Sequence, residues 1–250
     1  MRQKKEYRFF KGVTFLLISL LISHFSLFLS GCSNAQSQVS DDLEILLGSL
    51  TTKIFLEIMP AYDDPGWQNY LRSIGVPITR VCERPLFDYR FVVTQSSRPN
   101  AFASPDGTIF VTTGLIRALE YKKDAIAAVL AHEIGHIALR HGRSRLAKEL
   151  GWWAALSALF GVDQPAARVA GNIAGAMQPL GYGRNLELEA DSAGLRYLQK
   201  LHYPPDTMKK LLIKIEEIEK SREAPVVACL STHPSGKERL EHILGTALLK

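Results

Sequence analysis

Two histidines and a glutamate stand close together in the stretch AHEIGHIALRHG, residues 131–142. On a helix, residues four apart share a face, so His132 and His136 can present imidazole nitrogens to one metal ion. Glu133 lies one position round the helix, where its carboxylate can take a proton from a water on that ion. The flanking residues are nearly all apolar, and a buried helix rarely carries three such groups unless they are paired or bind a metal. This spacing predicts a zinc-binding catalytic helix, with one Zn²⁺ per chain.

A third ligand is predicted on a second helix, about fifty residues further along the chain. The metzincin class is excluded, because it needs a glycine and a histidine where this chain has Leu139 and Gly142. The stretch GRNLELEADSAG offers Glu187 and Asp191, which are four apart and share a face, whereas Glu189 points elsewhere. We expect Glu187 to bind the zinc and Asp191 to accept the outer N–H of a ligand histidine. A solvated acidic helix face is the alternative, and the histidine motif upstream makes it the weaker one.

The motifs HEIGHIALRHG, LELEAD and STHPS occur in this order, and together they resemble the zinc metallopeptidases that include HtpX, the CAAX prenyl proteases and the BepA-type enzymes. The resemblance covers roughly residues 60–250 and implies a zincin-like metallopeptidase domain that hydrolyses peptide bonds. His233 is then a candidate catalytic donor to the negative charge that develops during hydrolysis, and Arg239 is a second possible transition-state contact. A histidine before a proline can also start a helix without any further role. We interpret His141, at the end of the motif helix, as a partner of the helix dipole and not as a ligand.

The same resemblance implies that substrate adds to an edge strand formed by Asn100, Ala101, Phe102 and Ala103. Binding through main-chain hydrogen bonds suits unfolded chains, so we expect unfolded or misassembled envelope proteins as substrates. The chain departs from these families, because it shows neither the multi-span bundle of the prenyl proteases nor the C-terminal helical repeats of BepA. The alternative function is a non-catalytic, zinc-stabilised chaperone-like or assembly lipoprotein, and the presence of Glu133 argues against it.

The N-terminus has the pattern of an export signal. A basic segment is followed by the apolar run GVTFLLISLLISHFSLFL and then by LSGC, residues 29–32. This resembles a bacterial lipobox, so residues 1–31 are predicted to be a cleaved signal peptide and Cys32 to carry a lipid anchor. An uncleaved transmembrane anchor is the alternative, although an anchor needs no small residues and cysteine at its exit. Ser33, where an aspartate would signal retention, favours the outer membrane over the inner one, with the protein facing the periplasm.

The charge of the mature chain excludes nucleic acid as a predicted partner. The whole chain carries a net charge of +5, but residues 1–31 hold five of the basic residues and one of the acids. Their removal leaves 25 basic and 24 acidic residues, a net charge of +1. Residues 32–40 are predicted as a polar tether and residues 41–250 as the metallopeptidase domain.

Strands first and helices afterwards predict an α+β fold that is mostly helical, with one small, mainly antiparallel sheet. Strands are expected at 88–94 and 107–114, with a short strand and a turn between them. Helices are expected at 41–62, 64–75, 124–141, 143–160, 186–200, 205–222 and 236–248.

Lipidation of Cys32 would leave two cysteines, Cys82 and Cys229, in an oxidising compartment. An even number of remaining cysteines allows a disulfide between them, which would anchor the loop that carries His233. Two buried thiols that act as small hydrophobic side chains are the alternative.

Overall fold

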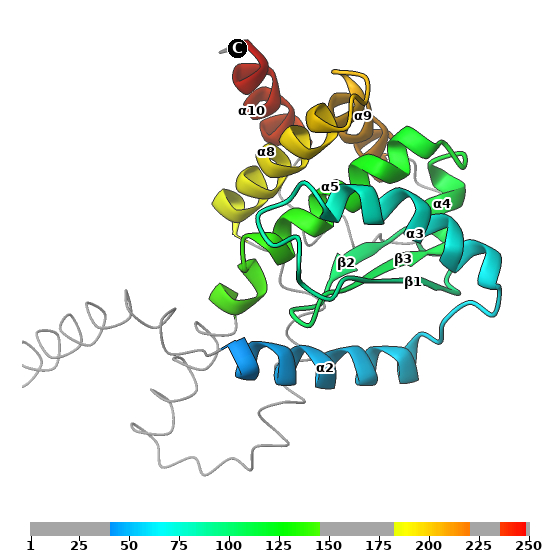
Figure 1. The fold of residues 1–250 in the computed structure, drawn as a ribbon. Coiled ribbons are helices and arrows are strands. Elements are labelled where there is room, and N and C mark those ends of the chain that lie inside the picture. Colours follow the sequence, from blue (N-terminus) through cyan, green and yellow to red (C-terminus); the bar gives the residue numbers. More distant parts are fainter. Residues whose placement is uncertain (1–40, 146–182, 221–235, 249–250) are drawn as a thin grey trace, which may run out of the picture.

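A computed structural model describes residues 41–145, 183–220 and 236–248 (Figure 1). Its first helix, α2 (Asp41–Ile58), carries three acidic residues in its first turn, where negative charge is favourable near the helix N-terminus. It ends four residues earlier than the expected 62, because Pro60 cannot continue the hydrogen-bonded ladder. Within the described residues, no helix combines the length and the apolar character that crossing a membrane requires.

The second helix, α3 (Pro65–Thr79), starts as the sequence predicts but ends later. The carboxylate of Asp64 caps it by accepting a hydrogen bond from the Gly66 N–H at 2.8 Å. The predicted end at Gly75 is wrong, because the helix continues through Pro77. A Cβ atom at Gly75 would lie 2.2 Å from the ring of Phe91, so this glycine allows close packing on the sheet and does not end the helix.

Three short strands form one mixed sheet in the order β1 (Arg90–Thr94), β3 (Thr108–Thr112) and β2 (Ala101–Ala103). β3 pairs with β1 in parallel over five residue pairs and with β2 antiparallel over three. The mostly helical α+β class with one small sheet is confirmed, but the sheet is mixed and not mainly antiparallel. The difference arises because β2 occupies the edge of the sheet opposite β1. β3 therefore lies between β1 and β2 and runs parallel to β1.

Two boundaries around the motif helix differ from those expected. A short helix, α4 (Thr113–Ala118), follows β3 at once, capped by the Thr112 hydroxyl, which accepts from the Leu115 N–H at 3.1 Å. The strand expected at 107–114 therefore ends two residues early. The next helix, α5 (Lys123–Ala138), ends before Arg140, whose φ of 58° is left-handed and stops the helix ahead of the expected Gly142.

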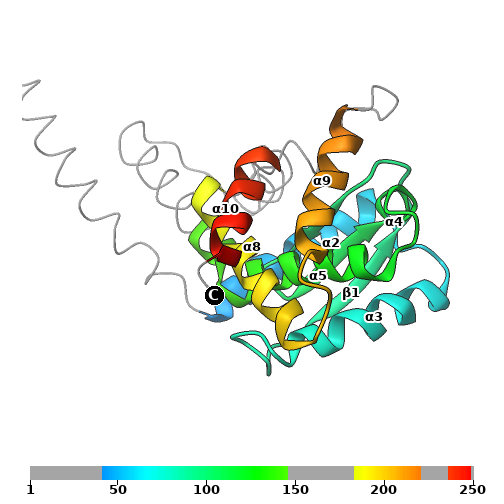
Figure 2. The same cartoon turned by 90° about the horizontal axis from the view of Figure 1, so that it is seen from above.

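The elements form layers around α5. α2 lies along one face of the sheet, whereas α3 and α5 lie on the other (Figure 1). The last three helices, α8 (Arg184–Lys200), α9 (Thr207–Lys220) and α10 (Gly236–Leu248), lie on the far side of α5 from the sheet (Figures 1 and 2). α5 is thus the central helix of the described fold.

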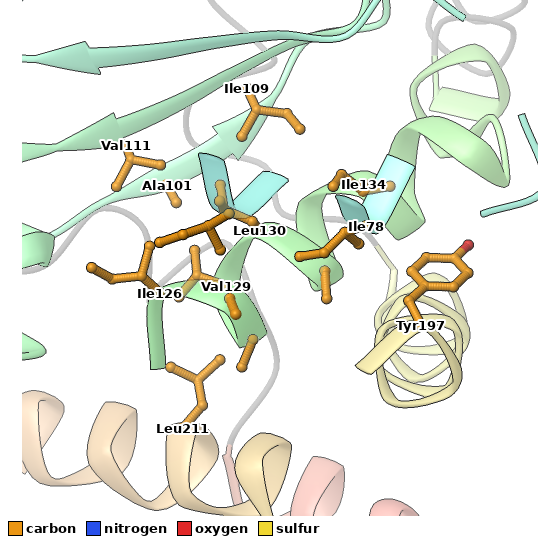
Figure 3. Close-up of a cluster of buried hydrophobic side chains, with 14 of the residues drawn as sticks. Ile78, Ala101, Ile109, Val111, Ile126, Val129, Leu130, Ile134, Tyr197 and Leu211 are labelled. Atoms are coloured by element: carbon orange, nitrogen blue, oxygen red, sulfur yellow. The ribbon is translucent and has the colours of Figure 1, made fainter. Parts of the chain in front are cut away.

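Side chains alternate between the two faces of the sheet, as a pleated strand requires. Phe102 and Phe110 stack at 4.7 Å between ring centroids, and Phe55 of α2 lies 4.1 Å and 5.4 Å from them. The opposite face contributes small and branched side chains to the main core, where the sheet residues Ala101, Ile109 and Val111 face α5 (Figure 3). Every residue from Ile126 to Ala138 is buried, which explains why α5 is apolar nearly all round.

Candidate metal centre

The motif side chains lie deep in the protein, on the central helix. His132, Glu133 and His136 are 4%, 3% and 1% exposed. Gly135, between the two histidines, allows α8 to approach, because a Cβ there would lie 3.1 Å from the carbonyl oxygen of Ala190. Close contact of α5 with α8 brings the acids of α8 to the histidines.

α8 presents its three acids as the i, i+4 spacing predicts. Glu187 and Asp191 are both fully buried, on the face that meets α5. The Glu189 side chain is 59% exposed, on the other side of the helix. The alternative of a solvated acidic face is therefore wrong for Glu187 and Asp191.

Three potential metal-binding groups converge from these two helices. The Nε2 atoms of His132 and His136 lie 3.0 Å apart. The carboxylate of Glu187 lies across from both, with one oxygen 3.4 Å from His132 Nε2 and the other 3.5 Å from His136 Nε2. All three residues can place a ligand atom within 4.8 Å of the other two.

This donor set fits a zinc ion. Two imidazoles and one carboxylate are the protein ligands of many catalytic zinc sites. Tetrahedral zinc with bonds of about 2.0–2.1 Å sets its ligand atoms about 3.3 Å apart. The separations of 3.0, 3.4 and 3.5 Å lie close to that value.

The Asp191 carboxylate and the Arg239 guanidinium lie on the Nδ1 side of the His132 ring. Nδ1 of His132 lies 2.8 Å from Oδ1 of Asp191, so an Nδ1–H donor leaves the Nε2 lone pair directed toward Glu187. Arg239 of α10 donates from Nε to Oδ2 of Asp191 at 2.7 Å and from a terminal nitrogen to Oδ1 at 2.6 Å. The guanidinium, 4% exposed, thus forms a bidentate pair with Asp191.

The pKa values of this cluster follow from burial and paired charge. Burial raises the pKa of Asp191, but hydrogen bonds and charge from Arg239 lower it more, to about 2. Burial and the Arg239 charge lower the pKa of His132, and the carboxylates of Asp191 and Glu187 outweigh them, so that it rises to about 9. A histidine must be neutral to bind a metal, so cation binding at this site would release a proton.

His136 has a partner that the sequence did not predict. Its Nδ1 lies 2.8 Å from Nδ1 of His141, which is 1% exposed. Nε2 of His141 lies 3.3 Å from Oε2 of Glu189. Burial lowers the pKa of His141, and the Glu189 carboxylate opposes this effect. His141 therefore contacts a motif histidine, whereas its position at a helix end suggested only a partner for the helix dipole.

The expected substrate strand lies at the edge of the sheet. β2 covers Ala101, Phe102 and Ala103, and the Asn100 carbonyl accepts from the Thr112 N–H at 2.9 Å. β2 is the edge strand on the side of β3 away from β1, and it contacts α5.

Other predicted residues fall outside the described part of the chain. These are Cys32 and the signal and tether segments, His233, and Cys229. Cys82, the member of the expected disulfide that the structure describes, is a buried free thiol. Its Sγ lies 3.1 Å from the carbonyl oxygen of Thr79 and 3.3 Å from the hydroxyl of Tyr89. The pairing of Cys82 with Cys229 stays a prediction, because Cys229 lies outside the described residues.

Comparison with known proteins decides the family. The model of Peptidase family M48 matches residues 65–247, which is most of the chain. The chain belongs to peptidase family M48. The matched range covers α5, α8 and α10 up to residue 247, the three helices that carry the candidate metal ligands and the residues around them. The expected metallopeptidase is thereby confirmed at the level of the family.

Curated relatives of this M48 chain carry protease names. It is 27% identical over 200 residues to "Mitochondrial metalloendopeptidase OMA1" of Schizosaccharomyces pombe, which covers 76% of this chain and 57% of that protein. It is 28% identical over 219 residues to "Beta-barrel assembly-enhancing protease" of Yersinia pestis, which covers 83% of this chain and 44% of that protein. The Escherichia coli protein of the same name is 27% identical, with the same coverage. The M48 chain thus spans about half the length of these relatives.

Proposed function

We propose that the chain is a zinc-dependent endopeptidase, with His132, His136 and Glu187 as the metal ligands and Glu133 as the general base. The observation that carries this proposal is the convergence of two imidazoles and one carboxylate within 3.5 Å of one another in a buried site. Membership of peptidase family M48 supports it.

Each residue has a distinct task in this mechanism. When bound, zinc would supply Lewis acidity, which lowers the pKa of water toward about 7 and polarises a peptide carbonyl. Glu133 accepts the proton of the attacking water and passes it to the leaving amine as the peptide bond breaks. Asp191 and Arg239 keep His132 oriented throughout.

The contacts of Arg239 add a second role to the one proposed from the sequence. Its Nε and one terminal nitrogen bind Asp191 at 2.7 and 2.6 Å, so we propose that Arg239 orients His132 through Asp191. Its other terminal nitrogen lies 3.9 Å from Oε2 of Glu187, and a contact with the transition state stays a prediction. His233 remains the proposed donor to the charge that develops on the substrate.

We further propose that substrate adds as an extra strand along β2. The Asn100 carbonyl and the Ser104 N–H bond to β3, at 2.9 and 2.8 Å. In an antiparallel pair the main-chain groups alternate in direction, so those of Ala103 are directed away from β3. A peptide paired with them would be held through its main chain, which favours unfolded substrates.

The proposed site of action is the bacterial cell envelope. The lipobox-like LSGC predicts a lipid anchor at Cys32, with the domain facing the periplasm and the outer membrane favoured. Relatives named for β-barrel assembly support unfolded or misassembled envelope proteins as substrates.

Cleavage of an unfolded protein tests the proposal. Casein and an unfolded β-barrel protein would be incubated with the zinc-loaded chain, with the chelated chain and with Glu133→Gln. We expect cleavage only in the first case, because chelation removes the metal and the substitution removes the base. Glu57→Gln on the exposed part of α2 is the matched control and should cleave like the wild type. Equal cleavage in all arms would disprove the peptidase; zinc binding with no cleavage in any arm would favour a chaperone-like or assembly lipoprotein.

A further inference from the structure

A second series of polar contacts ends at His136, the other motif histidine. His141 follows α5 and lies with its ring against His136, with the two Nδ1 atoms 2.8 Å apart. The far nitrogen of His141 faces Glu189 of α8, 3.3 Å from its Oε2. Seen from the metal centre, the order is His136, His141, Glu189. It parallels the order His132, Asp191, Arg239 on the first histidine.

The positions of the ring hydrogens set the direction of the hydrogen bonds from His136 through His141 to Glu189. An ionised carboxylate only accepts, so the Nε2 of His141 must carry the hydrogen that it shares with Glu189. A neutral His141 then has a lone pair on Nδ1. In the contact between the two Nδ1 atoms, the hydrogen must therefore come from Nδ1 of His136. That tautomer leaves the lone pair of His136 on Nε2, the atom that lies 3.0 Å from His132 Nε2. The contacts therefore select the form of His136 that can bind a metal.

Local backbone geometry accounts for the position of His141. Arg140, just before it, has a left-handed φ of 58°, which ends α5, and the chain is helical again at residues 141–145. The guanidinium of Arg140 is held by the Asp41 carboxylate of α2, and one of its nitrogens lies 3.7 Å from Glu44. A strained residue fixed by charged partners on another helix keeps this turn in place.

We propose that His141 is a positioning residue that fixes the tautomer and orientation of His136, and that Glu189 in turn fixes His141. This inference rests on the proposed function, because it takes His136 as a metal ligand. The exposed carboxylate of Glu189 contributes less than the buried ring of His141, since solvent screens its interaction.

Zinc affinity of the full chain tests this role. His141→Leu removes the acceptor and should weaken zinc binding by about ten- to a hundredfold, measured by competition with a chromophoric chelator. His141→Asn should recover most of the affinity, because its side-chain oxygen can take the place of Nδ1 as the acceptor. His202→Asn is the matched control: His202 is exposed and has a φ of 59°, which asparagine tolerates, so zinc affinity should not change.

Ring-nitrogen NMR provides a readout that a purely structural role would not affect. In the zinc-loaded wild type, we expect the hydrogen on Nδ1 of His136 and on Nε2 of His141. The opposite tautomer at either ring would overturn the inference, as would wild-type zinc affinity in His141→Leu. If His141→Leu fails to fold, His141→Asn and the tautomers decide. A wild type that binds no zinc would overturn the proposed function and this inference together, whereas a zinc-binding wild type with an unaffected His141→Leu variant overturns this inference alone.

Discussion

Nδ1 of His132 lies 2.8 Å from Oδ1 of Asp191, although the two residues are 59 positions apart in the chain. The contact joins α5 to α8, and both side chains are buried. It directs Nε2 of His132 toward Glu187, which lies one helical turn before Asp191. One turn of α8 thus supplies both a proposed ligand and the group that orients another.

Asp191→Asn should weaken zinc binding by about ten- to a hundredfold. Asparagine keeps an acceptor for the His132 N–H but loses the charge, and it leaves Arg239 without its buried counterion. Competition with a chelator of known affinity would measure the effect, with Asp206→Asn as control, because Asp206 is an exposed acid that pairs with Lys210. Wild-type affinity in Asp191→Asn would contradict the orienting role.

Glu187→Ala should abolish zinc binding, whereas Glu189→Ala should retain it. The Glu187 carboxylate faces both Nε2 atoms, at 3.4 and 3.5 Å. Glu189 contacts His141, which is not a proposed ligand, and its side chain is 59% exposed, so its loss should change the affinity by less than the loss of His141. Metal analysis of the two purified variants gives the answer, and the reverse pattern would mean that the other glutamate is the ligand.

The convergence of the candidate metal ligands could be predicted because helical spacing carries their geometry. The i, i+4 rule places His132 beside His136 and Glu187 beside Asp191, and it places Glu189 on another face. The partners of these residues could not be predicted in the same way. The contact between His136 and His141 depends on the left-handed backbone of Arg140, which no composition rule signals in an arginine.

The fold shows the same division between local and long-range information. Capping by Asp64 and the apolar pattern of α5 are local, and they gave the helices nearly correct starts. The end of α3 depends on packing of Gly75 against Phe91, a residue of another element. The direction of β3 relative to β1 depends on which edge β2 occupies, and strand periodicity does not contain that choice.

Arg239→Leu should destabilise the fold by about 3–5 kcal/mol, because the buried carboxylate of Asp191 loses its bidentate guanidinium partner and keeps only its contact with His132. Arg239→Lys should recover part of this loss, since a lysine keeps the charge but not the bidentate geometry. Denaturant unfolding of the chelated protein would measure both. A lower kcat in Arg239→Lys, with unchanged stability and zinc affinity, would instead support a direct contact with the transition state.

Two residues of α8 contact the carboxylate of Glu83, and this contact should depend on pH. The hydroxyl of Tyr197 donates to Oε2 of Glu83, and Arg196 lies 3.0 Å from Oε1 of the same carboxylate. Burial raises the pKa of Glu83, but the hydrogen bonds from Tyr197 and Arg196 outweigh it, so the pKa lies below its ordinary value. A carboxyl whose pKa falls on folding stabilises the protein above its unfolded pKa, and this contribution is lost as the pH falls through the folded pKa.

Tyr197→Phe should therefore destabilise the protein by about 1 kcal/mol at neutral pH, at the low end for a bond to a charged group because Glu83 is partly exposed. The difference from the wild type should be constant from about pH 7 down to the ordinary glutamate pKa of 4.5 and should shrink as the pH falls further, because protonation of Glu83 removes the hydrogen bond to its carboxylate that the wild type has and the variant lacks. Thermal unfolding of the two proteins across this range measures it, with Tyr121→Phe as control, since Tyr121 is 52% exposed. A difference that stays constant with pH would show that Tyr197 contributes through packing of its ring and not through the Glu83 carboxylate.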